Sequence, residues 1–313
     1  MKILVTGGAG FIGRWVVKKL LDKNHEVVVL DNLSNGRLQN IEEFKDNKNF
    51  EFIKGDILDI KLLSKIFKEK KLNTCIHLAA QINVQESLDN PKKSFDCNIV
   101  GTYNILEECR RNGIKLVLVG TCMVYDLANV KKPINEKHPV KQKSPYAGSK
   151  LAAENLAVSY YYGYELPVVI LRPFNTYGPY QKSNMEGGVV NIFIERALKG
   201  KPLLVFGDGM QTRDLLYVED CADFIVKSTF SDKAVGEIIN AGSGKDVTIN
   251  KLAETVSNGK VEIKHVLHHH PQSEIQKLVC DYSKAEKLLG WGPKTSLEEG
   301  IEKTKEWIRS SKL

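Results

Sequence analysis

Short apolar segments alternate with longer amphipathic segments through the first half of the chain. Val, Ile and Leu dominate the short runs, whereas the segments between them place apolar residues every three or four positions. Runs of the first kind predict buried strands, and segments of the second kind predict helices. We expect strands at 2–6, 26–31, 50–54, 74–77, 115–120 and 167–172, and helices that begin at Phe11, Lys61, Pro91 and Ser144.

This alternation is typical of an α/β fold with a doubly wound parallel sheet of the Rossmann type. After Arg172 the pattern becomes irregular, with Gly- and Pro-containing loops between shorter elements. We therefore expect a first domain at 1–175, with return segments near 212–240, and a smaller C-terminal domain at 176–313. No low-complexity linker separates the two, which predicts that they pack closely around a ligand cleft.

A glycine-rich segment joins the first expected strand to the first helix. Gly8, Gly10 and Gly13 match the pattern G-x-G-x-x-G within Thr6-Gly7-Gly8-Ala9-Gly10-Phe11-Ile12-Gly13. A turn without side chains lets backbone N–H groups and the helix N-terminus approach a pyrophosphate. The sequence therefore predicts a dinucleotide site. A turn that merely connects strand and helix is the alternative, and it is disfavoured because strand, turn and helix follow in register.

Two acidic residues refine the identity of the dinucleotide. Asp31 ends the second strand, where it can accept hydrogen bonds from both adenosine ribose hydroxyls and would repel a 2′-phosphate. This favours NAD over NADP, although Arg37 nearby argues in the other direction. Asp56 follows the third strand and is placed to meet the adenine, with an ordinary loop aspartate as the alternative.

Tyr146 and Lys150 stand four positions apart at the start of an expected helix, so both project from one face. A tyrosine has an ordinary pKa near ~10, but a lysine ammonium and a positive nicotinamide close by favour the phenolate. Tyr146 is then a general base, and the Thr121 hydroxyl could hold the reacting oxygen beside it. Y-x-x-x-K alone is a weak motif that also fits a surface tyrosine beside a lysine. The glycine motif and Asp31 favour the catalytic interpretation.

Composition excludes several classes of function. The 313 residues are 42% hydrophobic and 27% charged, and the net charge of +7 comes mostly from lysines on expected helix faces. Since no basic segment is interleaved with aromatic residues, we expect no nucleic-acid partner. No apolar run approaches the ~18 residues that span a membrane, and the first residues do not resemble a signal peptide. We expect a cytoplasmic protein without a membrane partner.

Cysteines and histidines are the candidate metal ligands. The six cysteines form no C-x-x-C pair, and we interpret them as reduced thiols. A histidine cluster follows an expected strand but has no carboxylate or cysteine partners at ligand spacing, so we expect a loop near the cleft and no metal site. The cluster consists of His265, His268, His269 and His270.

Over essentially its whole length the chain resembles the NAD-dependent epimerase/dehydratase family of extended short-chain dehydrogenases, which includes nucleotide-sugar 4-epimerases and 4,6-dehydratases. The segments that carry the resemblance are Thr6–Gly13, Asp31-Asn32-Leu33, Gly55-Asp56, His77-Leu78-Ala79-Ala80, Asn98-Ile99-Val100-Gly101-Thr102, Ser144-Pro145-Tyr146 with Lys150, Arg172-Pro173-Phe174-Asn175-Thr176-Tyr177-Gly178-Pro179, Gly207-Asp208-Gly209 and Gln211-Thr212-Arg213-Asp214.

The resemblance implies that tightly held NAD takes a hydride from a sugar carbon, usually C4, while Tyr146 takes the hydroxyl proton. It implies a nucleotide-sugar substrate bound by Thr121, Asn175, Val189, Arg213 and His270, with Arg213 on the diphosphate. A surface ion pair is the alternative for Arg213. The implied cofactor-binding residues are Gly7, Gly10, Phe11, Ile12, Gly13, Asp31, Asn32, Asn35, Gly36, Asp56, Ile57, Leu78, Ala79, Ala80, Gln81, Asn98, Tyr146, Lys150 and Phe174.

The chain departs from the family directly after Thr121. Members that resemble the 4,6-dehydratases carry Asp and Glu there as acid and base, whereas this chain has Cys122 and Met123. Methionine cannot take a proton, so the pattern favours a UDP-sugar 4-epimerase with Cys122 as a small buried filler. The alternative is an NDP-hexose dehydratase, by a 4,6- or an exo-glycal-forming 5,6-dehydration, in which the Cys122 thiol is a catalytic acid.

The resemblance also bears on the nucleotide, on the alternative without catalysis and on the assembly. His270 stands where many relatives carry an arginine for the second phosphate, which weakens any inference about the nucleotide. A non-catalytic NAD-sensing protein is the alternative from another class, and intact Thr121, Tyr146 and Lys150 argue against it.

The family pairs two helices of each subunit in a four-helix bundle, so we expect a homodimer through 91–112 and 144–163. Tyr160, Tyr161 and Tyr162 would supply contact surface there, unless they cover the chain's own core.

Overall fold

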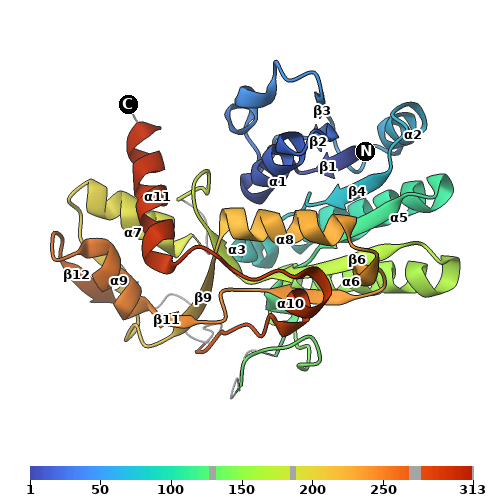
Figure 1. Ribbon diagram of the computed structural model, residues 1–313. Helices are drawn as coiled ribbons and strands as arrows, with labels where there is room; N and C mark the ends of the chain where they lie inside the picture. Colours follow the sequence, from blue (N-terminus) through green and yellow to red (C-terminus); the bar gives the residue numbers. More distant parts are fainter. Residues whose placement is uncertain (127–131, 184–187, 268–275, 312–313) are drawn as a thin grey trace.

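The computed structural model describes residues 1–126, 132–183, 188–267 and 276–311. A parallel sheet lies between two layers of helices, and a smaller part with its own short sheets packs at one end of it (Figure 1). The α/β class and the doubly wound sheet expected from the sequence are confirmed.

All seven strands of the central sheet run parallel. The chain starts in the middle of the sheet, adds strands toward one edge, and then returns to the other side of the first strand. In spatial order the strands are β10 (Ile238–Ala241), β6 (Val168–Pro173), β5 (Lys115–Val119), β4 (Thr74–His77), β1 (Lys2–Thr6), β2 (Glu26–Asp31) and β3 (Phe50–Lys54). The order reverses between β1 and β4, where ligands of such sheets bind at the carboxyl ends of the strands.

The six strands expected from the sequence are present, with ends that differ by at most one residue. The seventh, β10, was not expected as a strand, because it comes late in the chain within the irregular half. It pairs with β6 from Ile238–Ile170 to Ala241–Pro173 and so returns the chain to the first sheet.

Helices cover both faces of the sheet. On one face Val16, Phe224 and Ala285 pack against the strands, from α1 (Phe11–Asp22), α8 (Val218–Phe230) and α10 (Ser283–Leu289). On the other face the covering helices are α2 (Ile60–Glu69), α5 (Gly101–Asn112) and α6 (Pro145–Tyr164), and their buried residues form a second apolar cluster. None of the helices in these described ranges has the length and apolar character needed to cross a membrane.

Helix α6 carries the expected catalytic pair, and its first residue is set by local sequence. Ser144 is the N-cap, and its hydroxyl accepts a hydrogen bond from the Ala147 N–H at 3.2 Å. Pro145 follows at the first helical position, where its missing N–H has no intrahelical partner to lose. The helix therefore begins one residue before Tyr146 and points its first turn at the end of β5.

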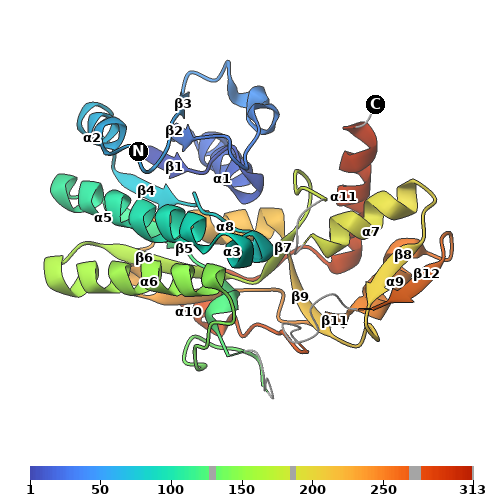
Figure 2. The ribbon, with the colours of Figure 1, turned by 180° about the vertical axis from the view of Figure 1, so that it is seen from behind.

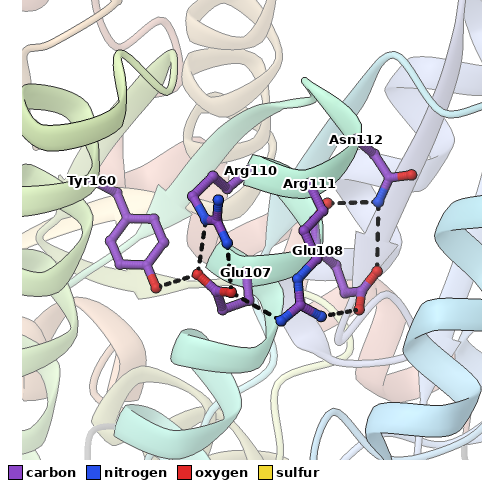
Figure 3. A network of polar contacts seen from close by, with 6 residues as sticks. All are labelled: Glu107, Glu108, Arg110, Arg111, Asn112 and Tyr160. Carbon is purple, nitrogen blue, oxygen red and sulfur yellow. Dashed lines mark hydrogen bonds and ion pairs between the residues drawn. The ribbon is translucent and has the colours of Figure 1, made fainter.

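Helices α5 and α6 lie side by side on one face of the central sheet (Figure 2). A polar network joins them near their C-terminal ends (Figure 3). The Tyr160 hydroxyl donates to the Glu107 carboxylate at 2.7 Å, and Arg110 donates to both oxygens of the same carboxylate at 3.0 Å. Tyr160 is buried and Tyr161 packs where a side chain at Gly236 would otherwise lie, whereas Tyr162 is exposed. Two of the three tyrosines therefore serve the chain's own packing.

The smaller part has an apolar cluster of its own. Its strands are β7 (Asn175–Tyr177), β9 (Thr212–Tyr217) and β11 (Asp246–Thr248) in one sheet, and β8 (Leu203–Phe206) and β12 (Ile263–Val266) in another. Its helices are α7 (Val189–Leu198), α9 (Ile249–Ser257) and α11 (Leu297–Ser310). Shorter helices elsewhere are α3 (Val84–Asp89), α4 (Pro91–Ser94), a π-helical turn at Phe95–Val100, and 3-10 turns at Leu38–Asn40, Glu42–Phe44, Cys122–Val124 and Asp232–Ala234.

Candidate active site

A cleft of about 1380 Å³ follows the carboxyl ends of the central strands and continues into the smaller part. One end is lined by the glycine-rich turn after β1, and the other by residues of β8, β9 and α7. Tyr146 and Lys150 of α6 line the same cleft. The cleft is large enough for a dinucleotide and a second ligand, since typical pockets measure about 300 to 1000 Å³.

The glycine-rich turn leaves no room for side chains. Gly7 has a φ of +72°, and a Cβ there would lie 2.7 Å from the Ala79 nitrogen. A Cβ at Gly13 would lie 2.2 Å from the Gly7 oxygen, so the turn and the first helical turn touch through backbone atoms alone. The shape fits the close backbone approach that a pyrophosphate requires.

Helix α1 opens toward the cleft without a side-chain cap. Gly10 occupies the N-cap in an extended conformation and offers no side-chain hydrogen bond, so the N–H groups of the first helical turn have no intrahelical acceptor. Gly10, Phe11, Ile12 and Gly13 all line the cleft. The positive end of the helix dipole and these donors suit a phosphate anion. The residues present therefore fit a dinucleotide.

Asp31 lies at the end of β2 and is 7% exposed. One carboxylate oxygen accepts from the Ala9 N–H at 3.0 Å and the other from the Leu33 N–H at 2.8 Å. Burial raises the pKa of Asp31, and these two hydrogen bonds oppose the rise. Each oxygen keeps a lone pair for a ribose hydroxyl. The loop beyond it is held close by Gly36, where a Cβ would lie 2.9 Å from the Ala9 backbone.

Most of the expected cofactor-binding residues line this cleft, but three do not. Asp56 accepts hydrogen bonds from the Asn32 side chain at 2.7 Å and from the Leu58 N–H at 2.9 Å. Gln81 and Asn98 are buried behind the wall, where the Asn98 side chain pairs with the Gln81 backbone. The expected residues on the cleft surface are Gly7, Gly10, Phe11, Ile12, Gly13, Asp31, Asn32, Asn35, Gly36, Ile57, Leu78, Ala79, Ala80, Tyr146, Lys150 and Phe174.

Thr121, Tyr146 and Lys150 meet at the end of β5. The Lys150 ammonium donates to the Val119 carbonyl at 2.7 Å, and the Tyr146 hydroxyl lies beside the Thr121 hydroxyl. Thr121 in turn accepts from the Met123 N–H at 3.2 Å. All three side chains are at least nine-tenths buried and line the cleft. This arrangement can hold a substrate hydroxyl beside a phenol.

The pKa of Tyr146 moves opposite to the direction expected from the sequence. Burial raises it to about 12, and the neighbouring Thr121 hydroxyl opposes only part of the rise. Lys150 gives its hydrogen bond to Val119 instead of to the phenol, and burial lowers the pKa of its own ammonium. In the chain alone the phenol therefore keeps its proton, and a base at neutral pH needs further positive charge in the cleft.

Cys122 and Met123 also line the cleft, in the 3-10 turn that Thr121 caps. Cys122 is 2% exposed and packs in a small apolar cluster with Phe174 and Cys280. Burial, with a smaller effect of Asp214, raises the pKa of its thiol to about 12. The side chain is thus both a small packing residue and a neutral thiol at the edge of the site.

The expected substrate residues lie at the other end of the cleft. Asn175, Val189 and Arg213 all line it. Arg213 precedes Asp214, which is fully buried and accepts from the N–H groups of Ser243, Gly244 and Cys280, so the base of the arginine is firmly held. His270 lies outside the described residues, as do His268 and His269. His265 is described, and its Nδ1 hydrogen-bonds with the Gly207 carbonyl at 2.9 Å.

Several cleft residues were not expected from the sequence. Gln211 could have been found, since it belongs to the same motif as Arg213. The α3 region carries no such signal, because its apolar residues follow neither a strand nor a long helix pattern. The unexpected lining residues include Ile82, Val84, Gln85, Leu88, Cys97, Tyr125, Lys141, Lys143, Ser144, Ser183, Ile192, Phe193, Leu204, Phe206, Gln211, Leu215 and Ile249.

Known proteins share both the sequence and the fold. Residues 4–304 match the family model described as GDP-mannose 4,6 dehydratase. A putative UDP-glucose 4-epimerase of Methanocaldococcus jannaschii is 38% identical over 99% of both chains. The structure of Pal from Bacillus thuringiensis is 58% identical, with a TM-score of 0.97 over 99% of this chain and 100% of that one.

A UDP-glucose 4-epimerase from Thermus thermophilus, solved in complex with NAD, is 36% identical, with a TM-score of 0.91 over 99% of this chain and 100% of that one. These similarities span nearly the whole chain, and they include the glycine-rich turn and the Tyr146 helix. The family expected from the sequence is therefore confirmed. The chain belongs to the NAD-dependent epimerase/dehydratase family of extended short-chain dehydrogenases.

Proposed function

We propose that the protein is an NAD-dependent nucleotide-sugar 4-epimerase that acts on a UDP-hexose. The observation that carries the proposal is the meeting of Thr121, Tyr146 and Lys150 in one cleft that the glycine-rich turn and Arg213 also line. The relative from Methanocaldococcus jannaschii named a putative UDP-glucose 4-epimerase supports the reaction, and the NAD in the Thermus thermophilus relative supports the cofactor. A non-catalytic NAD-sensing protein would have no need of this buried constellation.

The chemistry supplied by bound NAD is the reversible acceptance of a hydride. The chain's own residues manage the proton that accompanies it. Thr121 and Tyr146 are placed to share a substrate hydroxyl. With the positive charge of bound NAD in the cleft favouring the phenolate, Tyr146 would take the hydroxyl proton when the sugar is oxidised and return it when the sugar is reduced. Lys150, anchored on Val119, places a positive charge beneath them. Burial of all three excludes water from the transfer.

Arg213 and Asn175 are proposed to bind the substrate's phosphates. Both line the cleft at the end away from the glycine-rich turn, and a guanidinium can pair with a diphosphate through two parallel hydrogen bonds. Val189 stands at the first position of α7 and would pack beside them. The same arrangement supports the proposed division into a cofactor-binding part at 1–175, with return segments near 212–240, and a substrate-binding part at 176–313.

A nucleotide-hexose dehydratase is the second candidate, and the position of Cys122 favours it. The thiol lines the cleft next to Thr121, and its raised pKa keeps it protonated, as a proton donor must be. The same raised pKa makes it a weak acid, and Met123 beside it offers no base. The epimerase proposal therefore stands first.

Incubation with UDP-, GDP-, dTDP- and CDP-hexoses, followed by mass spectrometry and NMR, tests the proposal. A 4-epimerase leaves the mass unchanged and inverts one stereocentre, whereas a dehydratase loses water. Tyr146→Phe is the control, because it keeps the ring but removes the proton acceptor, and it should abolish both outcomes. Turnover that survives in Tyr146→Phe would contradict the assigned role of Tyr146.

The expected homodimer and cytoplasmic location are likewise proposals. Helices α5 and α6 support the dimer, because they lie side by side on one face and expose Phe95, Tyr103 and Tyr162 near or on them. The cytoplasmic location rests on the cysteine content, with all six thiols free.

A further inference from the structure

A buried ion pair lies directly behind the catalytic residues. Glu154 and Arg172 are 1% and 3% exposed, and neither lines the cleft. Arg172 donates to one oxygen of Glu154, Oε2, from Nη2 at 2.7 Å and from Nε at 3.0 Å. Its guanidinium also lies over the Tyr125 ring, 4.8 Å from the centroid. The pair is thus held on several sides, away from any ligand.

The other carboxylate oxygen of Glu154 has an unusual place. Oε1 is fully buried and makes no hydrogen bond of normal geometry, while the nearby Thr121 backbone N–H lowers the pKa of the carboxyl. It lies against the backbone of Gly120, where an added Cβ would come within 2.2 Å of it. A buried carboxylate is costly to remove from water even when it is paired, and a neutral apolar residue would avoid that cost. The negative charge of Glu154 acts at close range on the residues packed around it.

Those neighbours are the catalytic residues. Tyr146, Lys150 and Glu154 follow at four-residue steps along one face of α6. In the same order they contact the end of β5: Tyr146 reaches the Thr121 hydroxyl, Lys150 the Val119 carbonyl, and Glu154 the Gly120 backbone between them. One face of α6 thereby contacts three consecutive residues, Val119, Gly120 and Thr121, at the end of β5.

We propose that Glu154 is a positioning residue for proton transfer: held by Arg172, its carboxylate packs on the Gly120 backbone and supplies the negative charge that balances Lys150 beneath Tyr146. The inference rests on the proposed hydride-transfer function. It assigns no contact with substrate or cofactor to Glu154.

The charges around the three groups are few. Tyr146 faces Thr121 and Cys122, and Lys150 faces His77 and Cys97 as well as Glu154. His77 stays neutral, because burial lowers its pKa to about 3. Burial raises the pKa of Glu154, and the Arg172 guanidinium opposes that rise.

The Glu154 charge acts in one direction on both catalytic groups. Burial lowers the pKa of Lys150, and Glu154 opposes this. Burial raises the pKa of Tyr146, and Glu154 adds to it. Removing the charge should therefore lower the pKa of both groups, and both limbs of a pH–rate profile should move to lower pH.

The test is Glu154→Gln, which keeps the shape of the side chain and an oxygen for Arg172. We expect the pH optimum of turnover to fall by about one pH unit, as is typical for loss of a nearby charge. The rate at the new optimum should fall less than tenfold, and the amount of bound NAD should stay unchanged. Glu165→Gln is the matched control, since it removes the same charge from the exposed end of the same helix and should leave the profile in place.

A second measurement does not depend on turnover. The ultraviolet absorbance of the phenolate is titrated in the NAD-bound protein, and the titration of a matched Tyr146→Phe variant is subtracted. Glu154→Gln should shift the Tyr146 titration to lower pH. An unshifted titration in a variant that unfolds at the wild-type temperature would overturn the inference. Absence of turnover in the wild type with every sugar nucleotide would instead count against the proposed function.

Discussion

At the scale of single residues, Cys122 separates the two enzymatic interpretations. If it only fills space, Cys122→Ala removes a small side chain and no proton donor, so turnover should change less than tenfold, or under ~1.4 kcal/mol of barrier. We expect this mild outcome, because Met123 leaves no base beside the thiol. Turnover on the substrate found in the panel is the measurement.

The contrary outcome for Cys122→Ala is equally distinct. A catalytic acid contributes about 10²- to 10⁴-fold, so its loss would slow product formation by that factor. Hydride transfer to NAD, seen by absorbance, would persist because Thr121, Tyr146 and Lys150 remain. That combination would favour the dehydratase over the epimerase.

Motifs in the sequence located the glycine turn, Asp31 and the Thr121, Tyr146 and Lys150 side chains, because each has a fixed place relative to a strand end. Spacing could not show where Lys150 directs its hydrogen bond. The Val119 carbonyl lies on β5, 31 residues before Lys150 in the chain, and the degree of burial that sets the pKa of Tyr146 depends on the whole packed site.

At the scale of elements, the turn between β1 and α1 has no room for a side chain at Gly13. Gly13→Ala would place a Cβ 2.2 Å from the Gly7 oxygen, so backbone atoms must move apart where the pyrophosphate is expected. We expect wild-type protein to carry NAD after purification and the variant to carry at least tenfold less, an affinity loss of about 1.4 kcal/mol or more. Chromatography of the nucleotide released on denaturation measures it.

Gly163→Ala is the control for the glycine prediction. Gly163 is exposed on α6, and an added Cβ meets no atom within 4 Å. Alanine favours a helix over glycine by up to about 1 kcal/mol, so this variant should keep its NAD and be as stable as the wild type or more so. Equal NAD content in Gly13→Ala and wild type would show that the turn does not hold the dinucleotide.

The contact between α5 and α6 should weaken in acid through Glu107. Hydrogen bonds from Arg110 and, to a smaller extent, from Tyr160 lower the pKa of Glu107 to about 2 (Figure 3). Because the folded value lies below the ordinary value of 4.5, the stabilisation is complete above pH ~4.5 and is lost as the pH falls toward 2. Glu107→Gln should therefore cost about 1 to 2 kcal/mol at neutral pH, after allowance for solvent screening, and almost nothing near pH 2.

Thermal or denaturant unfolding of Glu107→Gln at several pH values measures this difference. Tyr160→Phe is the partner variant, because it removes one hydrogen bond and leaves the carboxylate with Arg110 and Arg111. It should show a smaller loss of the same sign. A difference between wild type and Glu107→Gln that is independent of pH would contradict the assignment.

At the scale of the whole molecule, the alternation of strands and helices predicted the central sheet but not its completion. Local periodicity identifies elements one at a time, whereas the pairing of β10 with β6 joins segments about 70 residues apart along the chain. The cleft wall formed by α3 and the two short sheets of the smaller part also depend on contacts between segments far apart in the chain, so local periodicity could not predict them. The motif in Gln211–Asp214 pointed to the second ligand-binding part without giving its shape.

The proposed homodimer is the last prediction, and it concerns the face made by α5 and α6. Phe95, in the turn that precedes α5, and Tyr103, on α5, are 52% and 46% exposed, whereas Tyr160 and Tyr161 pack within the chain. Aromatic residues are enriched in protein interfaces. We expect a dimer by light scattering at micromolar concentration, and a monomer for Tyr103→Glu, because a charge there would lose its hydration on association. Leu198→Glu, on α7 of the smaller part, should remain dimeric. A monomeric wild type would show that there is no dimer, and a dimeric Tyr103→Glu would show that the interface lies elsewhere.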